Sequence, residues 1–460
     1  MKLLPFRLFA EPARWARDRA SAPNTKRNCI FRAGRRAQPI PALSPTWGHA
    51  PVRVGTTPSA DPHIDGTVTS YWRDRRQHEK WRSRRIGRRA QTPSRRQCYL
   101  RPVSLSILSD VPLAPRTTFE LGGPARFLAE ITDAGDALAA LEWAKVKGLP
   151  VFVLGGGSNL VVADNGFAGL VLHMKTRGLR WSEKAGELRV EIAAGEAWDD
   201  VVRAAAEREL WGIECLSGIP GTAAAAPVQN IGAYGQEVAE SLRSVRVLDR
   251  ATLATRELAP DQCDFGYRTS LFKRQPDRFV LLWVTLGFPA NAKPSLGYAE
   301  LAAALADKAS PSPLTVRDTV LALRRKKSMV WDESDPNHRS AGSFFTNPIV
   351  SAEFAAQIAH RCVAAGLIAD PSGMPQFALQ GGRVKLAAGW LIERAGISKG
   401  LRMGSVGVST RHALALVHHG GGNAADLVRL ARHVRSTVFD RFAVELEPEP
   451  VFLGLDWRAD

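Results

Sequence analysis

Apolar and polar residues alternate along residues 103–460 with the periods of short strands and amphipathic helices. The 3.6-residue period predicts helices over residues 134–147, 197–210, 315–326, 352–366, 389–395 and 424–439. Short apolar runs predict strands over residues 150–154, 169–173, 188–192, 278–287 and 444–455. The run 278–287 is apolar on both faces, so we expect this strand to be buried. Helices and strands in this mixture favour an α+β or α/β architecture.

Residues 1–102 keep neither period for long and are rich in arginine and proline. They hold 23 Lys+Arg and 6 Asp+Glu, whereas the whole chain holds 62 Lys+Arg and 45 Asp+Glu. Residues 103–460 therefore hold 39 basic and 39 acidic residues. The entire formal charge of +17 therefore lies in the first 102 residues. We expect a basic, disordered extension or an upstream region outside the working protein, and translation starting at Val103 would fit the same pattern. A nucleic-acid-binding arm and an arginine-rich targeting segment are the alternatives.

The remaining composition narrows the class of protein. A chain of 460 residues is long enough for two or three domains. The balanced charge of residues 103–460 argues against nucleic acid as a partner of the folded part. The five cysteines form no CxxC pair, which indicates neither a zinc site nor a disulfide framework. The longest apolar run, 279–288, is too short to span a membrane, and we expect a cytoplasmic protein with reduced thiols.

A glycine turn follows the strand expected at 150–154. It reads Gly155, Gly156, Gly157, Ser158, Asn159. Glycines allow close approach of the backbone to a ligand, and successive N–H groups in such a turn can bind a diphosphate. The turn matches neither a Walker loop nor a GxGxxG motif, so a tight structural turn is the alternative.

A second stretch of small residues covers 217–235. Apolar residues recur among its glycines, which favours backbone pressed against a flat ligand over a flexible linker. The candidate ligand contacts in it are Gly218, Pro220, Gly221, Gln229, Asn230, Gly232, Ala233 and Tyr234.

Three polar residues stand in apolar surroundings and are candidates for catalysis. Arg268 follows Tyr267, and Ser343 precedes two phenylalanines. Glu449 belongs to a Glu-Pro-Glu sequence at the end of the strand expected over 444–455. Each has a simpler alternative: a surface cation, a turn serine and a solvated sheet edge.

Taken in order, these motifs resemble those of the UDP-N-acetylenolpyruvoylglucosamine reductase family. The resemblance covers roughly the last 350 residues and omits residues 1–102. The matching blocks are 116–119, 155–159, 229–235, 265–270, 343–348, 384–386 and 446–449. Tyr298 resembles the substrate-loop tyrosine of the longer of the family's two subtypes.

The resemblance implies an α+β protein. It would combine a two-subdomain FAD-binding fold of the vanillyl-alcohol-oxidase/PCMH type with a separate α+β substrate domain. The implied ranges are 103–330 for the FAD-binding domain, 331–443 for the substrate domain and 444–460 for a strand returning to the first domain. Both glycine-rich stretches would lie against FAD, and NADPH would be the reductant.

The resemblance also implies the reaction, which is reduction of UDP-N-acetylglucosamine enolpyruvate to UDP-N-acetylmuramate in peptidoglycan precursor synthesis. Ser343 would be the proton donor, and Arg268 and Glu449 would stabilise the enolate. Tyr298, Lys327 and Asn347 would lie near the UDP diphosphate. No metal ion is implied.

These roles are chemically sensible. An arginine can bind both oxygens of a substrate carboxylate, and a buried carboxyl group that stays protonated can donate to the developing charge. The serine would then protonate the α carbon.

One residue departs from the family pattern. The family usually has glycine where this chain has Ala224, and alanine would be strained there if the position needs positive φ. Three other functions remain as alternatives: an oxidase of small hydroxy acids on the same scaffold, a basic nucleic-acid-binding protein, and a flavoprotein that has lost its activity.

Overall fold

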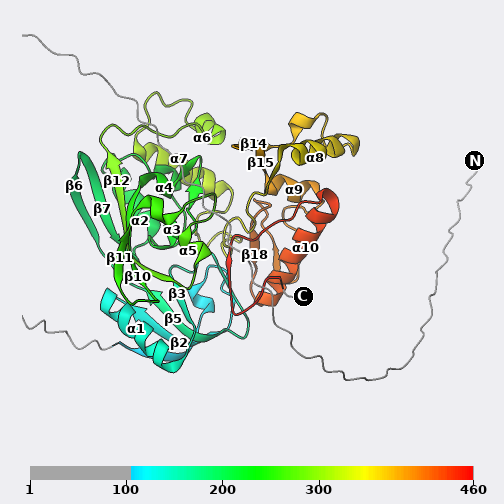
Figure 1. Ribbon diagram of the computed structural model, residues 1–460. Coiled ribbons are helices and arrows are strands. Elements are labelled where there is room, and N and C mark those ends of the chain that lie inside the picture. Colours follow the sequence, from blue (N-terminus) through cyan, green and yellow to red (C-terminus); the bar gives the residue numbers. More distant parts are fainter. Residues whose placement is uncertain (1–104, 459–460) are drawn as a thin grey trace, which may run out of the picture. The chain divides into compact units, whose positions relative to one another are not determined.

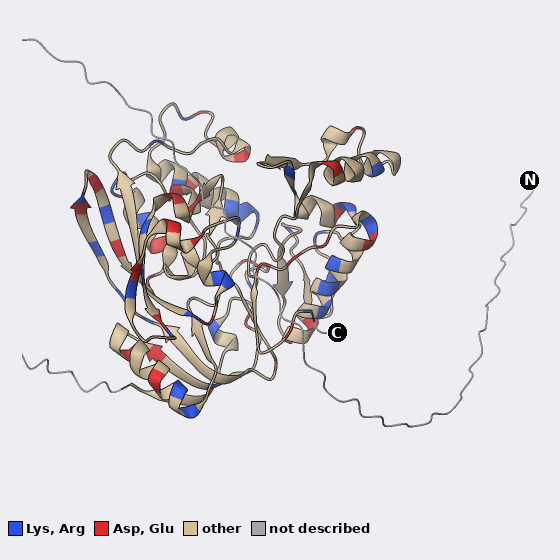
Figure 2. Ribbon diagram, in the orientation of Figure 1, with Lys and Arg blue, Asp and Glu red and all other residues tan. Residues whose placement is uncertain are grey.

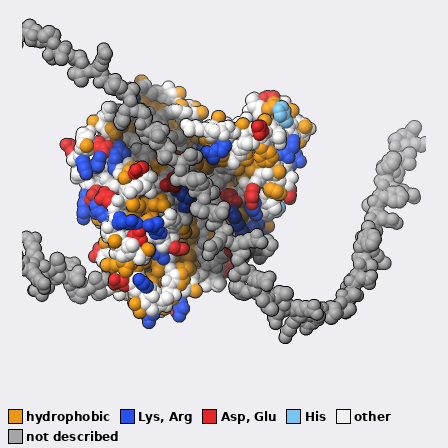
Figure 3. Space-filling model, in the orientation of Figure 1, with side chains coloured by type: hydrophobic (Ala, Val, Ile, Leu, Met, Phe, Trp, Pro, Cys, Tyr) orange, Lys and Arg blue, Asp and Glu red, His pale blue; other side chains and the backbone are white. Residues whose placement is uncertain are grey.

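The computed structural model describes residues 105–458, which belong to the unit Ser94–Asp460 (Figure 1). The basic extension expected over residues 1–102 lies outside the described residues. Within them, acidic and basic residues are interspersed along the helices and strands (Figure 2). The face drawn in Figure 3 likewise mixes charged and hydrophobic side chains.

A four-stranded sheet opens the described chain, in the order β1-β2-β5-β3. The bounds are β1 Ile107–Pro112, β2 Pro124–Ile131, β3 Val151–Leu154 and β5 Phe167–Met174. β1 runs antiparallel to β2, whereas β5 is parallel to both β2 and β3. The helix α1 (Ala134–Lys147) has the bounds expected from its periodicity, because the Asp133 side chain caps its start and Gly148 ends it with φ +63°.

A five-stranded antiparallel sheet follows, in the order β11-β10-β12-β7-β6. The bounds are β6 Leu179–Lys184, β7 Glu187–Ala193, β10 Leu242–Asp249, β11 Thr255–Leu258 and β12 Phe279–Pro289. β12 is central and mostly buried, as its run of apolar residues predicted. One apolar cluster joins both sheets to α1 and α2 (Trp198–Ala206).

Short elements between these strands carry the loops of interest. They are α3 Ala225–Val228, β8 Gly232–Ala233, β9 Gln236–Glu237, α4 Val238–Ser241 and α5 Leu271–Arg274. Further on lie α6 (Ala299–Ala304) and α7 (Pro313–Lys326), which pack with Tyr234 in a smaller apolar cluster. The short 3-10 helices are Ala114–Arg116, Glu214–Leu216, Pro260–Cys263 and Pro371–Gly373.

The C-terminal part contains two small sheets, β13-β15-β14 and β16-β17-β18. Their strands are β13 Ile349–Ser351, β14 Gln376–Leu379, β15 Arg383–Leu386, β16 Arg402–Met403, β17 Val406–Val408 and β18 Leu416–His418. The helices are α8 Ala352–Ala364, α9 Ala388–Arg394 and α10 Ala424–Phe442. The apolar cluster of this part also contains Phe119, Leu121 and Val161 from the first sheet's connections. The described residues contain no helix long and apolar enough to cross a membrane.

The strand expected over 444–455 is much shorter in the structure. Only β19 (Val451–Leu453) is a strand, and it pairs in parallel with β4 (Leu160–Val162). The preceding residues instead form backbone hydrogen bonds with the segment after Ser343. The Thr346 N–H donates to the Glu447 carbonyl, and the Glu449 N–H donates to the Phe344 carbonyl. Pro448 and Pro450 also cannot donate to a ladder. Glu449 therefore precedes the strand and does not end it.

Candidate active site

Two adjoining cavities of about 280 Å³ each lie within the described chain. The first, called the glycine cavity, is lined by Gly155–Gly157 and by apolar side chains such as Trp198 and Phe272. The second, called the polar cavity, is lined by Arg268, Ser343 and Glu449 among others. The six residues that line both cavities are Ser158, Asn159, Ile219, Pro220, Gln229 and Ile231. One elongated ligand could therefore extend from one cavity toward the other.

The glycine turn after β3 is packed so closely that side chains are excluded. A Cβ on Gly157, which has φ +64°, would lie 1.8 Å from the Arg116 carbonyl oxygen. A Cβ on Gly156 would lie 2.8 Å from the Gly221 Cα, which belongs to the second glycine-rich stretch. In this part of the described chain the buried Thr222 Oγ1 has no hydrogen-bond partner. A cradle of backbone with an unpaired hydroxyl at its rim fits an oxygen-rich ligand.

The second glycine-rich stretch lies between the two cavities. Pro220, Gln229, Gly232, Ala233 and Tyr234 line one or both cavities, and their contact with a ligand stays a prediction from the sequence.

Three of the expected contacts in this stretch do not line either cavity: Gly218, Gly221 and Asn230. Gly218 donates its N–H to Asp199, and Asn230 is buried with its side chain bonded to Glu237 and the Gly266 carbonyl. These two residues shape the loop, because their polar groups are directed at the protein.

Ala224 is free of the strain considered from the sequence. Its φ of −71° and ψ of −23° lie in the right-handed helical region, where it precedes α3. Alanine suits this conformation, so the condition for strain considered from the sequence, a positive φ, is not met here. The residue lines the glycine cavity through its small side chain.

Arg268 is held rigidly at the polar cavity. Its backbone has φ +53°, which is uncommon for a residue with a side chain. Its Nη2 donates to the Gly232 carbonyl at 2.5 Å and its Nη1 to the Asn230 carbonyl at 3.4 Å. Its Nε lies 3.4 Å from Glu449 Oε1. Nη1 and Nη2 each carry a second N–H, which an anionic ligand can accept.

Glu449 combines burial with a nearby cation. Burial raises the pKa of its carboxyl group, and the charges of Arg268 and Lys273 together with a hydrogen bond to Gln229 only partly oppose this rise. Its backbone carbonyl accepts from Asn159 Nδ2, which also donates to Gln229 Oε1 at 2.7 Å. Residues that line both cavities thus fix the position of Glu449.

Ser343 is positioned by the aromatic core behind it. Phe344 and Phe345 are buried, and the Phe344 N–H donates to the Leu414 carbonyl at 2.7 Å. Ser343 itself bridges to Ala415, while Gly342 before it has φ +69°. This turn leaves the Ser343 side chain at the wall of the polar cavity. The structure thereby brings Arg268, Glu449 and Ser343 together around one cavity, although the sequence separates them widely.

Another part of the polar cavity wall, called its cationic end, carries basic and aromatic side chains. Tyr298 and Lys327 line it, and their contact with the UDP diphosphate stays a prediction. Lys327 Nζ donates to Glu300 at 2.5 Å and lies 5.8 Å from the centre of the Tyr234 ring. The Tyr234 and Tyr298 rings meet edge to face at 5.3 Å. Burial raises the pKa of Tyr234 to about 12, which keeps its hydroxyl protonated as a donor.

Asn347 lies elsewhere. It lines neither cavity, and its Oδ1 accepts from the Ala388 N–H at 2.9 Å. Its backbone N–H donates to the Tyr267 hydroxyl. The expected contact of Asn347 with substrate therefore stays a prediction, and its present bonds support the backbone at the start of α9.

Sequence reasoning missed Arg324 and His412, which also line the polar cavity. Burial lowers the pKa of Arg324 to about 10, and its Nη2 donates to the Met329 carbonyl. Burial, with the charge of Lys327 next, lowers the pKa of His412 to about 4, so its ring is neutral at pH 7. The run of basic residues at 324–327 was a signal for Arg324, whereas nothing in the sequence distinguished His412 from other histidines.

Comparisons with known proteins agree with this geometry. Residues 125–253 match the FAD binding domain family, and residues 335–453 match the family of the UDP-N-acetylenolpyruvoylglucosamine reductase C-terminal domain. The chain is 44% identical over 358 residues to the UDP-N-acetylenolpyruvoylglucosamine reductase of Thermobifida fusca, which covers 77% of this chain and 99% of that one. The chain is also 46% identical over 353 residues to the Streptomyces coelicolor enzyme of the same name. That match covers 76% of this chain and 90% of the other.

A solved structure shows the same fold. The UDP-N-acetylenolpyruvylglucosamine reductase (MurB) from Thermus caldophilus superposes with a TM-score of 0.52 at 24% identity, covering 76% of this chain and 99% of that chain. Together with the FAD-binding match, it confirms the expected α+β class, an FAD-binding fold with a separate C-terminal domain.

Proposed function

The chain belongs to the UDP-N-acetylenolpyruvoylglucosamine reductase family, and we propose that the two cavities form its active site. The protein is an FAD-dependent oxidoreductase that uses NADPH to reduce UDP-N-acetylglucosamine enolpyruvate, a step of peptidoglycan precursor synthesis. The observation that carries the site assignment is that Arg268, Glu449 and Ser343 line one cavity, in which Glu449 contacts Asn159 and Gln229, two residues that line both cavities.

The glycine cavity fits FAD. Its backbone cradle at Gly155–Gly157 and the unpaired Thr222 hydroxyl suit a diphosphate, and its apolar wall with Trp198 and Phe272 suits flat rings. Bound there, FAD supplies hydride transfer. The residues common to both cavities would then hold the flavin at the border of the polar cavity.

Arg268 and Glu449 would bind the substrate's carboxylate. Hydride addition to the terminal carbon of the enolpyruvyl group leaves negative charge on that carboxylate and the α carbon. The second N–H groups of Arg268 Nη1 and Nη2 can hold the two carboxylate oxygens as a fork. The raised pKa of Glu449 favours a neutral carboxyl, which donates a hydrogen bond to the same charge.

Ser343 would complete the reduction by donating a proton to the α carbon. A carbanionic carbon is a strong base, so a hydroxyl of ordinary acidity suffices when it is held in position. The bridge to Ala415 and the two buried phenylalanines provide that positioning.

The cationic end of the polar cavity would hold the nucleotide diphosphate. Tyr298 and Lys327 would contact it, with Arg324 alongside. Asn347 would need to move from its bond with Ala388 to contribute. The cytoplasmic location and the absence of a nucleic-acid partner stay predictions from the sequence.

Three measurements on the purified protein test this function. A visible flavin spectrum is expected, and it would separate flavoenzymes from a nucleic-acid-binding protein. NADPH consumption should require the enolpyruvyl UDP-sugar. Consumption of oxygen with small hydroxy acids, and none of NADPH with the UDP-sugar, would indicate the oxidase instead. A flavin spectrum without turnover of any kind would indicate a flavoprotein that has lost its activity.

A further inference from the structure

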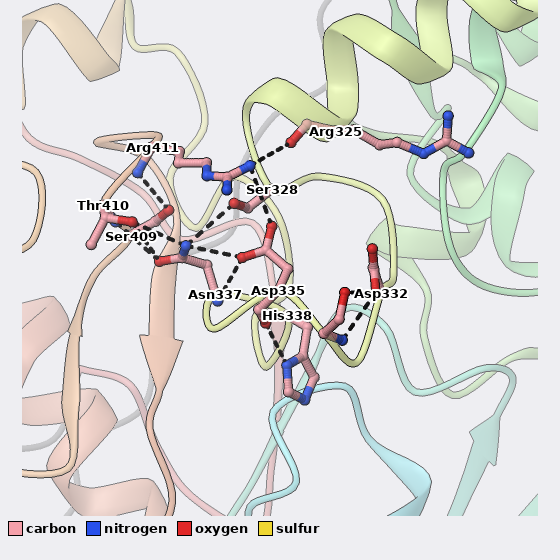
Figure 4. Close-up of polar contacts among 10 residues, drawn as sticks. Arg325, Ser328, Asp332, Asp335, Asn337, His338, Ser409, Thr410 and Arg411 are labelled. Carbon is pink, nitrogen blue, oxygen red and sulfur yellow. Dashed lines mark hydrogen bonds and ion pairs between the residues drawn. The ribbon is translucent and has the colours of Figure 1, made fainter.

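Asn337 is a buried amide that joins three separate segments of the chain (Figure 4). Its Nδ2 lies 3.3 Å from Ser328 Oγ, 3.1 Å from Asp335 Oδ1 and 3.1 Å from Thr410 Oγ1. Its Oδ1 accepts from the Thr410 backbone N–H at 3.0 Å. Both the nitrogen and the oxygen of the amide are therefore hydrogen-bonded. A buried polar side chain that is satisfied in this way favours one conformation of the segments around it.

Each segment that Asn337 joins leads directly to a residue of the polar cavity. Ser328 follows Lys327, and Thr410 stands two residues before His412. Asn337 itself lies in the connection between Lys327 and Ser343. Lys327 and His412 both line the polar cavity and are close enough for the charge of Lys327 to lower the pKa of His412.

Polar contacts contribute most to this junction, although the Trp331 and His338 rings in the same stretch meet edge to face at 5.3 Å. Within residues 105–458, no residue between 328 and 340 belongs to an apolar cluster or packs against one. Arg411 extends the polar contacts, with its Nη1 donating to the Arg325 carbonyl at 3.2 Å and lying 3.8 Å from Asp335 (Figure 4). Asp335 in turn accepts from the Asn337 backbone N–H at 2.9 Å. The amide is therefore the centre of the junction.

The junction also fixes an unusual backbone conformation. Ser328 is buried with φ +55°, directly after Lys327 and the end of α7. Such a conformation persists in a residue with a side chain only when the surroundings enforce it. Its hydroxyl contact with Asn337 is one such constraint, and it sets the direction in which the chain leaves Lys327.

We propose that Asn337 is a positioning residue for substrate binding: by tying Ser328 to Thr410, it holds Lys327 and His412 at a fixed separation in the wall of the polar cavity. This proposal rests on the proposed function. Asn337 does not line the cavity, so its effect must pass through these neighbours. If Lys327 and His412 become less well positioned, the affinity for the UDP-sugar in the ground state should fall. The rate of the chemical step should change less, because it depends on Arg268, Glu449 and Ser343.

The test is steady-state kinetics of the FAD-loaded enzyme with the enolpyruvyl UDP-sugar. For Asn337→Ala we expect KM to rise by about tenfold or more while kcat stays within about threefold. The flavin spectrum should not change, because Ser328, Asn337 and Thr410 do not line the glycine cavity.

Asn423→Ala is the matched control for a merely structural effect. Asn423 is an asparagine in the same C-terminal part, and its side chain caps α10 without lining either cavity. We expect this variant to lower the melting temperature and leave KM unchanged. If Asn337→Ala likewise lowered only the melting temperature, the positioning role would be wrong.

Thr410→Val keeps the test valid if Asn337→Ala yields no soluble protein. This change replaces the hydroxyl by a methyl group. It keeps the hydrogen bond from the backbone N–H of residue 410 to Asn337 Oδ1. A rise of about threefold in KM is expected, and an unchanged KM would overturn the proposal. Turnover by the unaltered enzyme is measured first. Its absence would refute the proposed function, whereas turnover with insensitive variants would refute only the role of Asn337.

Discussion

At the scale of single residues, Ser343 should separate the two halves of the catalytic cycle. Oxidation of NADPH needs no proton donor for the substrate, so Ser343→Ala should bind FAD and be bleached by NADPH at nearly the unaltered rate. Reoxidation by the enolpyruvyl UDP-sugar should fall by roughly 10²–10⁴-fold, because a positioned proton transfer is lost. Stopped-flow absorbance of the flavin reads both steps.

Two outcomes would remove Ser343 from this role. Equal slowing of both steps would make it a residue that supports the cavity, which its bridge to Ala415 also allows. Unchanged reoxidation would mean that the proton comes from elsewhere. Ser343→Cys should recover part of the rate, since a thiol can also donate a proton.

Glu449 should impose a pH dependence on the same step. Burial raises its carboxyl pKa above the ordinary value of 4.5, so the neutral, donating form persists to higher pH. Reoxidation by substrate should therefore slow as pH rises through this raised pKa. Glu449→Gln keeps an N–H donor without a titration, so this alkaline decline should disappear while part of the rate remains.

Glu447→Gln provides the control for the pH profile. Glu447 lies two residues earlier on the same segment, but its half-exposed carboxylate pairs with Arg458 at 3.1 Å. Its replacement should leave the decline in place. Persistence of the decline in Glu449→Gln would assign it to another group at the cavity.

The sequence indicated which residues to consider, but not how they meet. Arg268, Ser343 and Glu449, which the sequence suggested as catalytic residues, line one cavity in the structure, and their catalytic roles stay predictions. His412 became visible only in the structure, because its importance depends on burial and on neighbours distant in sequence; for Arg324 the basic run 324–327 was a signal, but its burial was not apparent from the sequence. Asn230 and Asn347 were predicted as ligand contacts, yet both direct their side chains at other groups of the protein, a difference that residue type alone cannot show.

At the scale of elements, the loop before α3 gives a stability prediction. Ala224 is buried and helical in φ and ψ, so Ala224→Gly adds freedom to the unfolded chain without relieving strain. The substitution should cost about 0.5–1 kcal/mol and lower the melting temperature by roughly 1–3 °C. Thermal unfolding of the FAD-loaded protein measures this. A higher melting temperature would contradict the helical conformation.

Elements with strong local signals were predicted best. α1 has the bounds expected, because its capping aspartate and terminal glycine are local features of the sequence. The expected helix over 197–210 ends at Ala206, and the expected strand over 444–455 shortens to Val451–Leu453. In the second case tertiary hydrogen bonds to Phe344 and Thr346 replace the sheet, and periodicity carries no information about such partners.

At the scale of the whole molecule, the described residues share cores that cross the ranges expected for the domains. Phe119, Leu121 and Val161 pack into the apolar cluster of the C-terminal part. The carboxylate of Asp164 accepts from the backbone N–H groups of Ala424 and Ala425 at the start of α10. The two parts therefore depend on each other for stability, although the division at residue 330 stays a prediction.

The first 102 residues are expected to be dispensable for catalysis. A chain beginning at Val103 keeps Leu105 and Ile107, which pack against the largest apolar cluster, and keeps all of β1. It also carries 39 basic and 39 acidic residues, so its formal charge falls from +17 to zero. We expect this chain to fold, bind FAD and turn over the UDP-sugar at the full-length rate, while losing the retention on a polyanion column that the basic extension confers.

A chain beginning at Leu113 is the matched comparison. It loses β1, which is the edge strand paired with β2 along Ile107–Pro112, and so exposes the hydrogen-bonding edge of β2. We expect this shorter chain to aggregate or to lose FAD, because the first sheet carries the glycine turn after β3. If the chain from Val103 instead behaved like the chain from Leu113, the first 102 residues would be part of the working fold. Equal activity of all three chains would show that β1 itself contributes nothing to the site.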